Sequence, residues 1–425
     1  MAGPLPYPVV RVPSLSMPGY PSFRLGLPSR RIHDALTRHG SELVHLASPF
    51  FLGARGSAVA QHLKLPTIAV YQTDMPAYAR AYRTRGLGEA FAWHWLRGIH
   101  NAADRTLAPS TASATDLHAH GISRVWLWGR GVDTERFHPG LRSSWLHSLL
   151  APDGEVLAGY VGRLATEKRV ELLAHVAALP GVRLVIVGSG PAEGMLRRII
   201  PAAVFLGERQ GRQLARIYAS LDVFVHSGPY ETFGQTLQEA AASGLPVVAP
   251  AAGGPLDLVD DGVTGFLVAP GDAGALAAGV ARLAGDPALR AAQGRAGRAK
   301  VLGRSWSALG DELIGHYAAV LESAVLPGQA ALPGQAVLPG QAVLPGQAAL
   351  PGSAGPLGSA RPGKSTGSVE LAGSAGSAES AGSAALTGLP GRSVLSGRSL
   401  RATRSVRSVL SARPGRSVRR DRAKA

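Results

Sequence analysis

The chain has 425 residues, a formal net charge of +16 and no cysteine. Without cysteine it can form no disulfide, thiolate nucleophile or cysteine-ligated metal site, and a reducing cytoplasm is permitted. It contains no run of eighteen apolar residues, and its start lacks the charged and apolar regions of a secretory signal. We therefore expect neither a membrane-spanning helix nor an export signal, in a chain long enough for two hydrophobic cores.

The positive charge is concentrated at the C-terminal end. Residues 353–425 contain 13 Lys and Arg against 3 Asp and Glu, whereas residues 324–352 carry no charge. Segment 326–352 repeats the pattern LPGQA with a sixth small residue, and proline and glycine at this spacing prevent both helix and β-ladder. We expect 324–425 to be a disordered extension, either a solvated low-complexity tail or a basic arm that binds anionic lipid or another polyanion.

Short β-branched segments alternate with helical patterns along the rest of the chain. The predicted strands are 42–46, 66–71, 105–109, 156–162, 182–188, 203–207, 222–227, 246–250 and 265–270. This alternation is typical of βαβ units, in which helices cover both faces of a parallel sheet. We therefore predict an α/β fold made of two facing doubly wound, Rossmann-like domains.

A change of pattern in 131–155, where proline, glycine and charge replace the alternation, predicts a connection between the two domains. The predicted boundaries are 1–135 for an N-terminal domain on the acceptor side, 136–155 for the linker, 156–323 for a nucleotide-binding C-terminal domain, and 324–425 for the tail. In such folds ligands bind in the crevice outside the carboxyl ends of the strands.

Two cations follow the predicted strand 156–162. Arg163 and Lys168 stand five residues apart at what the pattern predicts to be the start of a helix. Backbone amides at a helix start, two cations and a nearby glycine form an anion site suited to a diphosphate. The alternative is a solvated helix start with a salt bridge to Glu167 or Glu171.

Glycines follow the next strand, in VIVGSGP (185–191). Gly188 and Gly190 allow a backbone to approach a ligand, but strand-to-helix turns use glycine routinely, so this signal is weak. The segment is not a dinucleotide fingerprint, because Gly194 fits that pattern loosely and no acidic residue ends the following strand.

Two carboxylates stand eight residues apart in YETFGQTLQEA (230–240). Glu231 is predicted in the exit loop of strand 222–227, and Glu239 on the helix that Gly244 ends. A loop carboxylate beside free amides can accept hydrogen bonds from sugar hydroxyls, while a helix carboxylate suits a more distant pair such as a ribose diol. Alternatively, both are exposed glutamates that the helix dipole favours.

Five motifs in order resemble the C-terminal domain of retaining glycosyltransferases of family 4, which have the GT-B fold. They are GRLATEK (162–168), VGSGP (187–191), ETFGQTLQE (231–239), SGLPVVAPAAGG (243–254) and DGVTGFLV (261–268). The resemblance extends over about residues 43–323. The segments LVHLASPF, IAVYQTDMPAYA, ADRTLAPS and WGRGVDTERFHP are most similar to one branch, the actinobacterial GDP-mannose-dependent α-mannosyltransferases that modify membrane lipids.

The resemblance implies a role for each matching residue on the donor side. Arg163 and Lys168 would hold the nucleotide diphosphate and neutralise charge on the leaving group. Glu231, with the amides around Phe233 and Gly234, would contact the donor sugar. A same-face displacement that retains the anomeric configuration would need no dedicated nucleophile.

The resemblance also implies that Gly188 and Gly190 border the donor and that Glu239 contacts the ribose hydroxyls. No metal and no cofactor would be required, and the sequence has no Asp-x-Asp metal motif. The partners would be a nucleotide-sugar donor, expected to be GDP-mannose, and a membrane lipid or lipid-linked glycan acceptor. We expect no specific nucleic-acid partner.

The sequence departs from the family pattern in two places. Where many relatives have histidine, YQTD has Gln72, an amide that can hydrogen-bond but cannot act as a base. Asp74 is then the nearest ionisable candidate for a catalytic role beside Gln72 and Glu231. Second, roughly the first fifty residues of the family pattern, with a strand and a glycine loop, have no counterpart, which predicts a truncated N-terminal sheet with exposed strand edges.

Segment 75–105 mixes arginines and aromatic residues. Such a mixture suits an interfacial helix near anionic lipid headgroups, which predicts a cytoplasmic protein bound peripherally to the inner face of the plasma membrane. The alternative is a set of core aromatics with a solvated basic face. Two other functions stay open: a UDP-sugar-dependent enzyme of the same fold, and a non-catalytic remnant whose basic tail binds polyanions.

Overall fold

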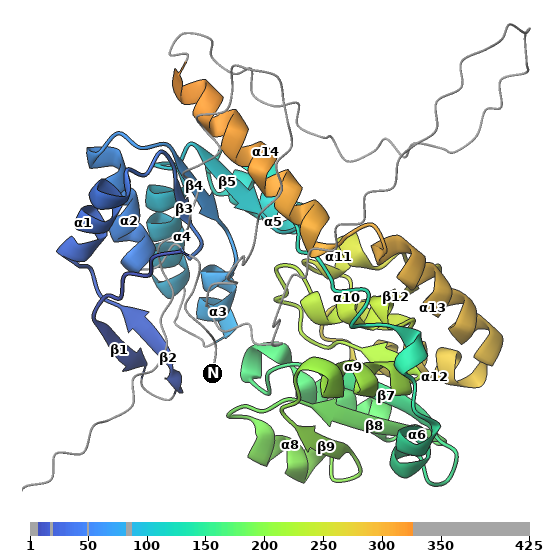
Figure 1. Cartoon of the computed structure of the whole chain (residues 1–425). Helices are drawn as coiled ribbons and strands as arrows, with labels where there is room; N and C mark the ends of the chain where they lie inside the picture. The colour runs from blue at the N-terminus through green and yellow to red at the C-terminus, as the bar shows by residue number, and fades with distance from the viewer. Residues whose placement is uncertain (1–6, 18–19, 49–50, 82–86, 326–425) are drawn as a thin grey trace, which may run out of the picture.

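The computed structural model describes residues 7–17, 20–48, 51–81 and 87–325, which form two α/β bodies (Figure 1). The tail predicted from residue 324 lies outside the described residues, except that its first two residues end the last helix. Parallel sheets with helices on their faces make up each body, so the predicted fold class is confirmed.

Six parallel strands form the C-terminal sheet, in the order β12-β11-β10-β7-β8-β9. Because β7 and β10 are neighbours, the strand order reverses between them, and the exit loops of β7 and β10 diverge at this point. The strands are short and mainly apolar; the four central ones are almost entirely buried, and the edge strands β9 and β12 are mostly half-buried. They are β7 (Val156–Val161), β8 (Val182–Val187), β9 (Val204–Gly207), β10 (Val223–Val225), β11 (Val247–Pro250) and β12 (Gly265–Val268).

Helices cover both faces of this sheet, and each face has its own buried cluster. One cluster contains α9 (Gly211–Ser220) and α10 (Gln235–Ala242). The opposite cluster contains α7 (Ala174–Ala177), α8 (Glu193–Ile199) and α12 (Ala273–Gly285). The remaining segments are α6 (Ser144–Leu150), α11 (Pro255–Leu258), α13 (Pro287–Val301) and the 3-10 turns η1 (Pro139–Leu141), η2 (Thr166–Lys168) and η3 (Val170–Leu173).

Four parallel strands form the N-terminal sheet in the simple order β3-β4-β5-β6, and a separate antiparallel hairpin joins β1 to β2. Helices α1, α2 and α4 share one cluster on one face of the sheet. These elements are β1 (Ser14–Met17), β2 (Tyr20–Gly26), α1 (Arg30–His39), β3 (Val44–Leu46), α2 (Phe51–His62), β4 (Thr67–Val70), α3 (Met75–Ala81), α4 (Leu87–His100), β5 (Arg105–Ala108), α5 (Thr111–Ala119) and β6 (Val125–Leu127).

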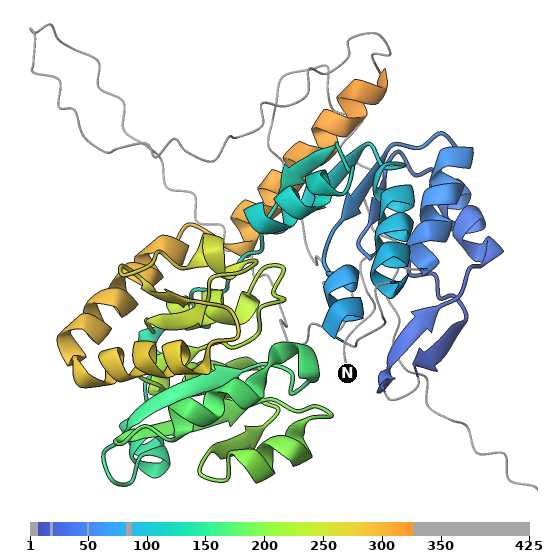
Figure 2. The same cartoon turned by 180° about the vertical axis from the view of Figure 1, so that it is seen from behind.

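The last helix, α14 (Trp306–Val325), returns from the C-terminal body to the opposite face of the N-terminal sheet (Figures 1 and 2). Tyr317 packs there, and its hydroxyl lies 2.6 Å from Nδ1 of His45. Where the chain crosses between the bodies, Val132 N donates to Arg304 O at 2.8 Å. A side chain on Gly131 would overlap the backbone of Trp306, so the two crossing segments pack closely.

The predicted strands are all present with boundaries shifted by one or two residues, but four structural features differ from the sequence prediction. The β1–β2 hairpin and β6 were not predicted, and α6 lies inside the segment interpreted as a linker. The helix predicted at Arg163 and Lys168 is wrong. Arg169 has φ 51°, a left-handed conformation that separates the short turns η2 and η3 and prevents a continuous α-helix.

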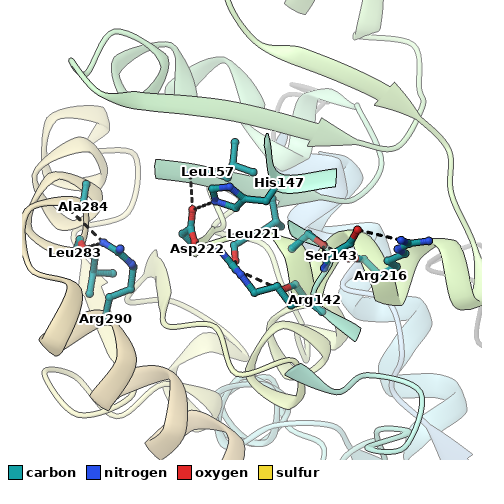
Figure 3. A network of polar contacts seen from close by, with 12 residues as sticks. Arg142, Ser143, His147, Leu157, Arg216, Leu221, Asp222, Leu283, Ala284 and Arg290 are labelled. Carbon is teal, nitrogen blue, oxygen red and sulfur yellow. Dashed lines mark hydrogen bonds and ion pairs between the residues drawn. The ribbon is translucent and has the colours of Figure 1, made fainter. Parts of the chain in front are cut away.

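Asp222, just before β10, connects α6 to the amino ends of β7 and β10 (Figure 3). One carboxylate oxygen accepts from Arg142 Nη2 at 2.7 Å, and the other accepts from His147 at 2.8 Å and Leu157 N at 2.9 Å. Burial alone would raise the pKa of Asp222, but these hydrogen bonds and the Arg142 charge lower it overall. Asp222 thus fixes α6 against β7 and β10.

We expect Asp222→Ala to lower the free energy of unfolding at pH 7 by roughly 2–4 kcal/mol, because it leaves partly buried donors unpaired. Since the folded pKa is depressed, this stabilisation is present above the unfolded pKa of 3.8 and is lost as pH falls through the lower folded value. Urea titrations at several pH values measure the difference.

Glu193→Ala is the control, because Glu193 pairs with Arg197 on the exposed side of α8 and its loss should cost about 0.5 kcal/mol or less. Equal losses in the two variants would contradict the role given to Asp222.

Candidate functional site

A cavity of about 440 Å³ lies between the two bodies, at the carboxyl ends of the C-terminal strands. The loops that follow β7, β10, β11 and β12 face α3 and α5 across it. Charged side chains line it from both sides, Asp74, Arg80 and Asp116 on one and Arg169 and Glu231 on the other. The lining residues are Asp74, Arg80, Ala112, Ser113, Asp116, Arg169, Pro229, Tyr230, Glu231, Thr232, Ala252, Gly253, Pro270 and Gly271.

A buried ion pair joins the two loops that diverge where the strand order reverses. Lys168 Nζ, after β7, donates to Glu231 Oε2, after β10, at 2.8 Å. Both residues are buried, with exposed fractions of 7% and 5%. Ser227 Oγ donates to Lys168 O at 2.9 Å and keeps the loops in contact. The fold therefore brings together two predicted site residues that are 63 positions apart in the sequence.

The loop that carries Glu231 is positioned by the glycine pair after β11. Gly254 N donates to Glu231 O at 2.7 Å. A side chain on Gly253 would overlap Glu231 O, and one on Gly254 would overlap Phe233 O. Only glycine permits this close approach of the two loops, so Gly253 and Gly254 determine where the backbone of Glu231 lies.

Arg163 pairs with Glu167 rather than lining the cavity. Its Nη2 lies 2.6 Å from Glu167 Oε1, and its side chain stays about one third exposed. Tyr160 OH donates to Arg163 O at 3.1 Å. This is the salt bridge that the sequence allowed as an alternative, and its acidic member Glu167 directly precedes Lys168 of the buried Lys168–Glu231 pair.

Gly188 and Gly190 are explained by contact between neighbouring loops. A side chain on Gly188 would overlap Gly162 O, and one on Gly190 would overlap Leu164 O. Neither residue lines the cavity. Their requirement for glycine therefore follows from packing of the β7 exit loop against the β8 exit loop, whatever ligand lies beyond them.

Phe233 and Gly234 lie beneath the cavity rather than on its wall. Phe233 is 3% exposed and belongs to a hydrophobic cluster of the C-terminal body. Gly234 has φ 99°, which favours glycine, and precedes the first residue of α10. The Phe233 side chain anchors the loop, and only backbone groups of these two residues remain for contact with a ligand.

Glu239 is fully buried on α10 and does not line the cavity. Neither of its carboxylate oxygens makes a well-formed hydrogen bond with the described residues, although the Tyr218 and Gln235 side chains lie near. Burial raises the pKa of Glu239 to about 8. A buried carboxyl group without good partners calls for an explanation, and a ligand hydroxyl pair is one.

Asp74 is the main polar group on the N-terminal side of the cavity. Its Oδ1 accepts from Ala77 N at 2.8 Å, and the buried Tyr71 hydroxyl donates to its carboxylate. Burial raises the pKa of Asp74 against the opposing effect of these hydrogen bonds. Gln72 contributes its backbone: Thr232 Oγ1 donates to Gln72 O at 3.1 Å.

Other contacts between the bodies border the cavity. Thr111 N donates to Asp257 Oδ2 at 2.7 Å, and Ser113 Oγ donates to Thr232 O at 3.4 Å. Together with the Thr232–Gln72 bond, these contacts fix the distance between Asp74 and Glu231, which face the same cavity from opposite bodies.

Sequence reasoning missed several residues of this site. Arg169, Tyr230, Ser113 and Asp116 line the cavity but belong to no motif, and a lone side chain on α5 gives no periodic signal. His226 was also missed: it is 2% exposed, and its Nε2 lies 3.6 Å from Glu231 Oε2. For Arg169 no sequence signal predicts the left-handed backbone.

Within the described ranges, no group of three or more His, Asp or Glu side chains is arranged to hold a metal ion. Over the same residues, no helix is both long and apolar enough to cross a bilayer.

Two family profiles match the chain. The profile described as "Glycosyltransferase Family 4" matches residues 2–136, and the profile described as "Glycosyl transferases group 1" matches residues 142–300. Together they cover both bodies.

Curated proteins with high similarity share one name. A GDP-mannose-dependent alpha-mannosyltransferase of Mycobacterium tuberculosis is 50% identical over 313 residues, which are 73% of this chain and 82% of that protein. Proteins of the same name from Mycolicibacterium smegmatis and Corynebacterium glutamicum are 49% and 41% identical, over 74% and 75% of this chain and 83% and 77% of their own lengths.

Solved structures with the same arrangement include a sucrose-phosphate synthase from Thermosynechococcus elongatus, with a TM-score of 0.61 and 25% identity over 68% of this chain and 76% of that one. Anabaena HepE in complex with UDP-glucose has a TM-score of 0.58 and 23% identity over 68% of this chain and 82% of its own. The latter likeness concerns the fold alone.

The buried carboxyl group of Glu239 predicts a pH-dependent stability. Between the usual pKa of 4.5 and the folded pKa of about 8, the folded chain holds a proton that the unfolded chain releases, so stability falls as pH rises. Glutamine cannot ionise. We therefore expect ligand-free Glu239→Gln to melt several degrees above the parent at pH 8 and close to it at pH 4.5, as measured by calorimetry.

Glu193→Gln, an exposed carboxylate on α8, is the matched control and should leave the pH profile of the melting temperature unchanged. If the stability of the parent chain does not decline between pH 4.5 and pH 8, the raised pKa of Glu239 is contradicted.

Proposed function

Because the chain belongs to glycosyltransferase family 4, we propose that it transfers mannose from GDP-mannose, with retention of configuration, to a membrane lipid or a lipid-linked glycan. The observation that carries the donor assignment is 50% identity to a GDP-mannose-dependent alpha-mannosyltransferase, over 82% of that protein's length. The cavity between two Rossmann-like bodies, with its polar walls, supports the reaction class.

On the donor side, the diphosphate of GDP-mannose binds near Arg163 and Lys168, and the mannose lies next to Glu231. Lys168 and Arg163 already sit in a largely buried loop, where a cation stabilises a developing phosphate charge better than it does in water. Glu231 accepts hydrogen bonds from mannose hydroxyls. The ligand-free pairs Lys168–Glu231 and Arg163–Glu167 keep the four charges compensated until the donor binds.

On the acceptor side, Asp74 receives a hydrogen bond from the attacking hydroxyl. Its raised pKa makes it a better proton acceptor than an ordinary exposed carboxylate, and the leaving phosphate is the final base in a same-face displacement. Gln72 places the backbone of this loop against Thr232. The bond between mannose and phosphate breaks as the acceptor oxygen bonds to the same face of the anomeric carbon.

The nucleotide itself extends from the diphosphate toward α10. Glu239 serves as the ribose contact if α10 or the Tyr218 side chain moves enough to expose its carboxylate. Backbone amides near Phe233 and Gly234, at the start of α10, complete the sugar site. Since the acceptor is borne by a lipid, the enzyme works as a peripheral protein on the cytoplasmic face of the plasma membrane.

The nucleotide preference gives a direct test. We expect calorimetric titration to show GDP binding at least tenfold tighter than UDP binding, roughly the discrimination that one or two base hydrogen bonds provide. Transfer of labelled mannose from GDP-mannose to a membrane lipid extract measures the activity. Preference for UDP would remove the mannosyl donor and favour a UDP-sugar enzyme of this fold.

Two isosteric changes at the ion pair separate the roles proposed for its members. Glu231→Gln should lower mannose transfer by roughly 100-fold or more and leave GDP affinity nearly unchanged, because it removes a carboxylate that contacts the sugar. Lys168→Met should weaken GDP binding by roughly tenfold or more, because it removes a phosphate contact.

Asp260→Asn provides the control for both variants, because Asp260 is an exposed carboxylate paired with Lys300 in the loop before β12. Normal transfer by Glu231→Gln would sink the placement of the donor sugar. The thermal unfolding of each variant is measured separately, because each substitution replaces the charged partner of a buried ion.

A further inference from the structure

An aromatic patch is exposed on the N-terminal body, formed by Phe51 of α2 and by Phe91 and Trp95 of α4. Phe51 is 51% exposed and Phe91 is 63% exposed. Both rings contact Trp95, with ring centroids 5.8 Å from Phe51 and 6.1 Å from Phe91. Single exposed apolar residues are common, but two exposed phenylalanine rings packed on the same half-buried tryptophan form a larger apolar patch, which is typical of an interaction site.

The outer face of α2 continues this patch with positive charge. Phe51, Arg55, Ala58 and His62 are all exposed and follow at helical spacing, so they form one stripe along the helix. Helix α2 contains no acidic residue. Beyond its end, the His62 ring lies 6.2 Å from the His33 ring of α1, so the stripe continues onto α1.

The neighbouring helices add further cations. Among the described residues of α1, α2 and α4, the exposed charged side chains are Arg30, Arg31, Arg38, Arg55 and Arg97 against Asp34. The acidic residue of α4, Glu89, is half-buried and paired with Arg80. Arg55 lies one turn after Phe51 on the α2 stripe, whereas Arg97 lies beside Gly121 on another face of α4. An apolar aromatic centre beside cations is complementary to an anionic lipid surface, where aromatic rings sit at headgroup depth and arginines contact phosphate.

The patch lies on the outer side of the N-terminal body, on the helices that cover the sheet face opposite α14. Helices α1, α2 and α4 cover the face opposite α14, and in Figure 1 they form the outer side of the N-terminal body. Helix α4 also reaches the cavity, because Glu89, two residues before Phe91, pairs with Arg80, and Arg80 lines the cavity wall. A surface that held Phe91 would therefore hold the acceptor side of the cavity close to itself.

We propose that the outer faces of α2 and α4, centred on Phe51, Phe91 and Trp95, dock on an anionic bilayer and place the cavity beside the lipid headgroups. The delivery of a lipid-borne acceptor rests on the proposed function, whereas the docking itself needs neither donor nor acceptor. The two are tested by different measurements.

The absence of cysteine allows the docking face to be identified in the full chain. Ala58→Cys places a single label site on the α2 stripe, and Leu149→Cys places one on α6, at a residue 61% exposed on the other body. With phosphatidylglycerol-rich vesicles, an environment-sensitive dye at position 58 should shift to the blue and be quenched by nitroxide-labelled lipid. The same dye at position 149 should not respond.

A vesicle-bound chain whose dye at position 58 stays as water-exposed as it is in solution would overturn the proposal, because it would mean that the basic segment 353–425 alone binds the lipid. Shielding of position 58 without vesicles, rising with protein concentration, would overturn it as well and indicate that a second copy of the chain covers the patch.

Paired variants then measure the contribution of the aromatic rings. The full-length double variant Phe51→Ser and Phe91→Ser should bind these vesicles about tenfold more weakly, since each ring loses apolar burial. The double variant Trp145→Ser and Leu149→Ser removes an equally exposed apolar pair from α6 and should bind like the parent. Both keep residues 326–425, so any contribution of that segment cancels in the comparison.

Equal vesicle affinity of the two double variants would overturn the proposal. GDP titration of each variant shows that it is folded, because none of the four residues lines the cavity. A parent chain that docked through position 58 but bound no GDP would refute the proposed function and leave the docking surface standing.

Discussion

The buried pair of Lys168 and Glu231 is the interaction on which the rest of the site depends. Taking two charges out of water costs several kcal/mol per ion unless the geometry is good and further hydrogen bonds exist. Here the strand order supplies the geometry, because β7 and β10 are neighbours and their exit loops meet where the order reverses. The hydroxyl of Ser227 and the glycine pair after β11 then hold the two loops in contact.

This pair also explains why the neighbouring residues are small or special. Gly228 lets its loop pass close to the Lys168 backbone, where a side chain would meet Lys168 Cα at 3.2 Å. Arg169 adopts a left-handed backbone directly after Lys168, and its side chain reaches the cavity. Strain of this kind, of order 1–3 kcal/mol, persists only where the surrounding structure determines it, and it is typical of functional sites.

Much of the fold was predictable because the C-terminal strands are continuous β-branched runs separated by glycine and proline. The position of Lys168 and Glu231 at one edge of the sheet was predictable for a related reason: both follow strand ends, and strand ends converge at one edge of a parallel sheet. Position after a strand made Arg163, Lys168 and Glu231 candidates, and the roles given to them came from the family resemblance. The Arg163–Glu167 pair was one of two salt bridges that the sequence allowed, whereas the Lys168–Glu231 pair was not predicted, because only the loop geometry brings these two residues together.

The unpredicted features depend on contacts between segments far apart in the chain. Nothing near Glu239 in sequence indicates that Tyr218 of α9 covers it, and a helix carboxylate reads as exposed until the packing partner is known. Asp116 and Ser113 reach the cavity only because the two bodies face each other. The 3-10 turns after β7 arose from one residue, Arg169, whose backbone conformation carries no signature in its type.

The two bodies differ in the side chains that they present. The C-terminal body concentrates buried charge around its strand ends, which suits a charged and water-soluble nucleotide sugar. The parallel sheet of the N-terminal body has four strands against six in the C-terminal sheet, and the outer helices α2 and α4 expose aromatic rings. Helices α3 and α4 link these properties, because the Arg80–Glu89 pair connects the cavity wall to the turn that carries Phe91. A force that fixes α4 at a lipid surface therefore also fixes Arg80, while Asp74 at the start of α3 faces Glu231 across the cavity. The hydrogen bonds from Thr111 to Asp257, from Ser113 to Thr232 and from Thr232 to Gln72 then hold this side of the cavity at a fixed distance from the loop of Glu231.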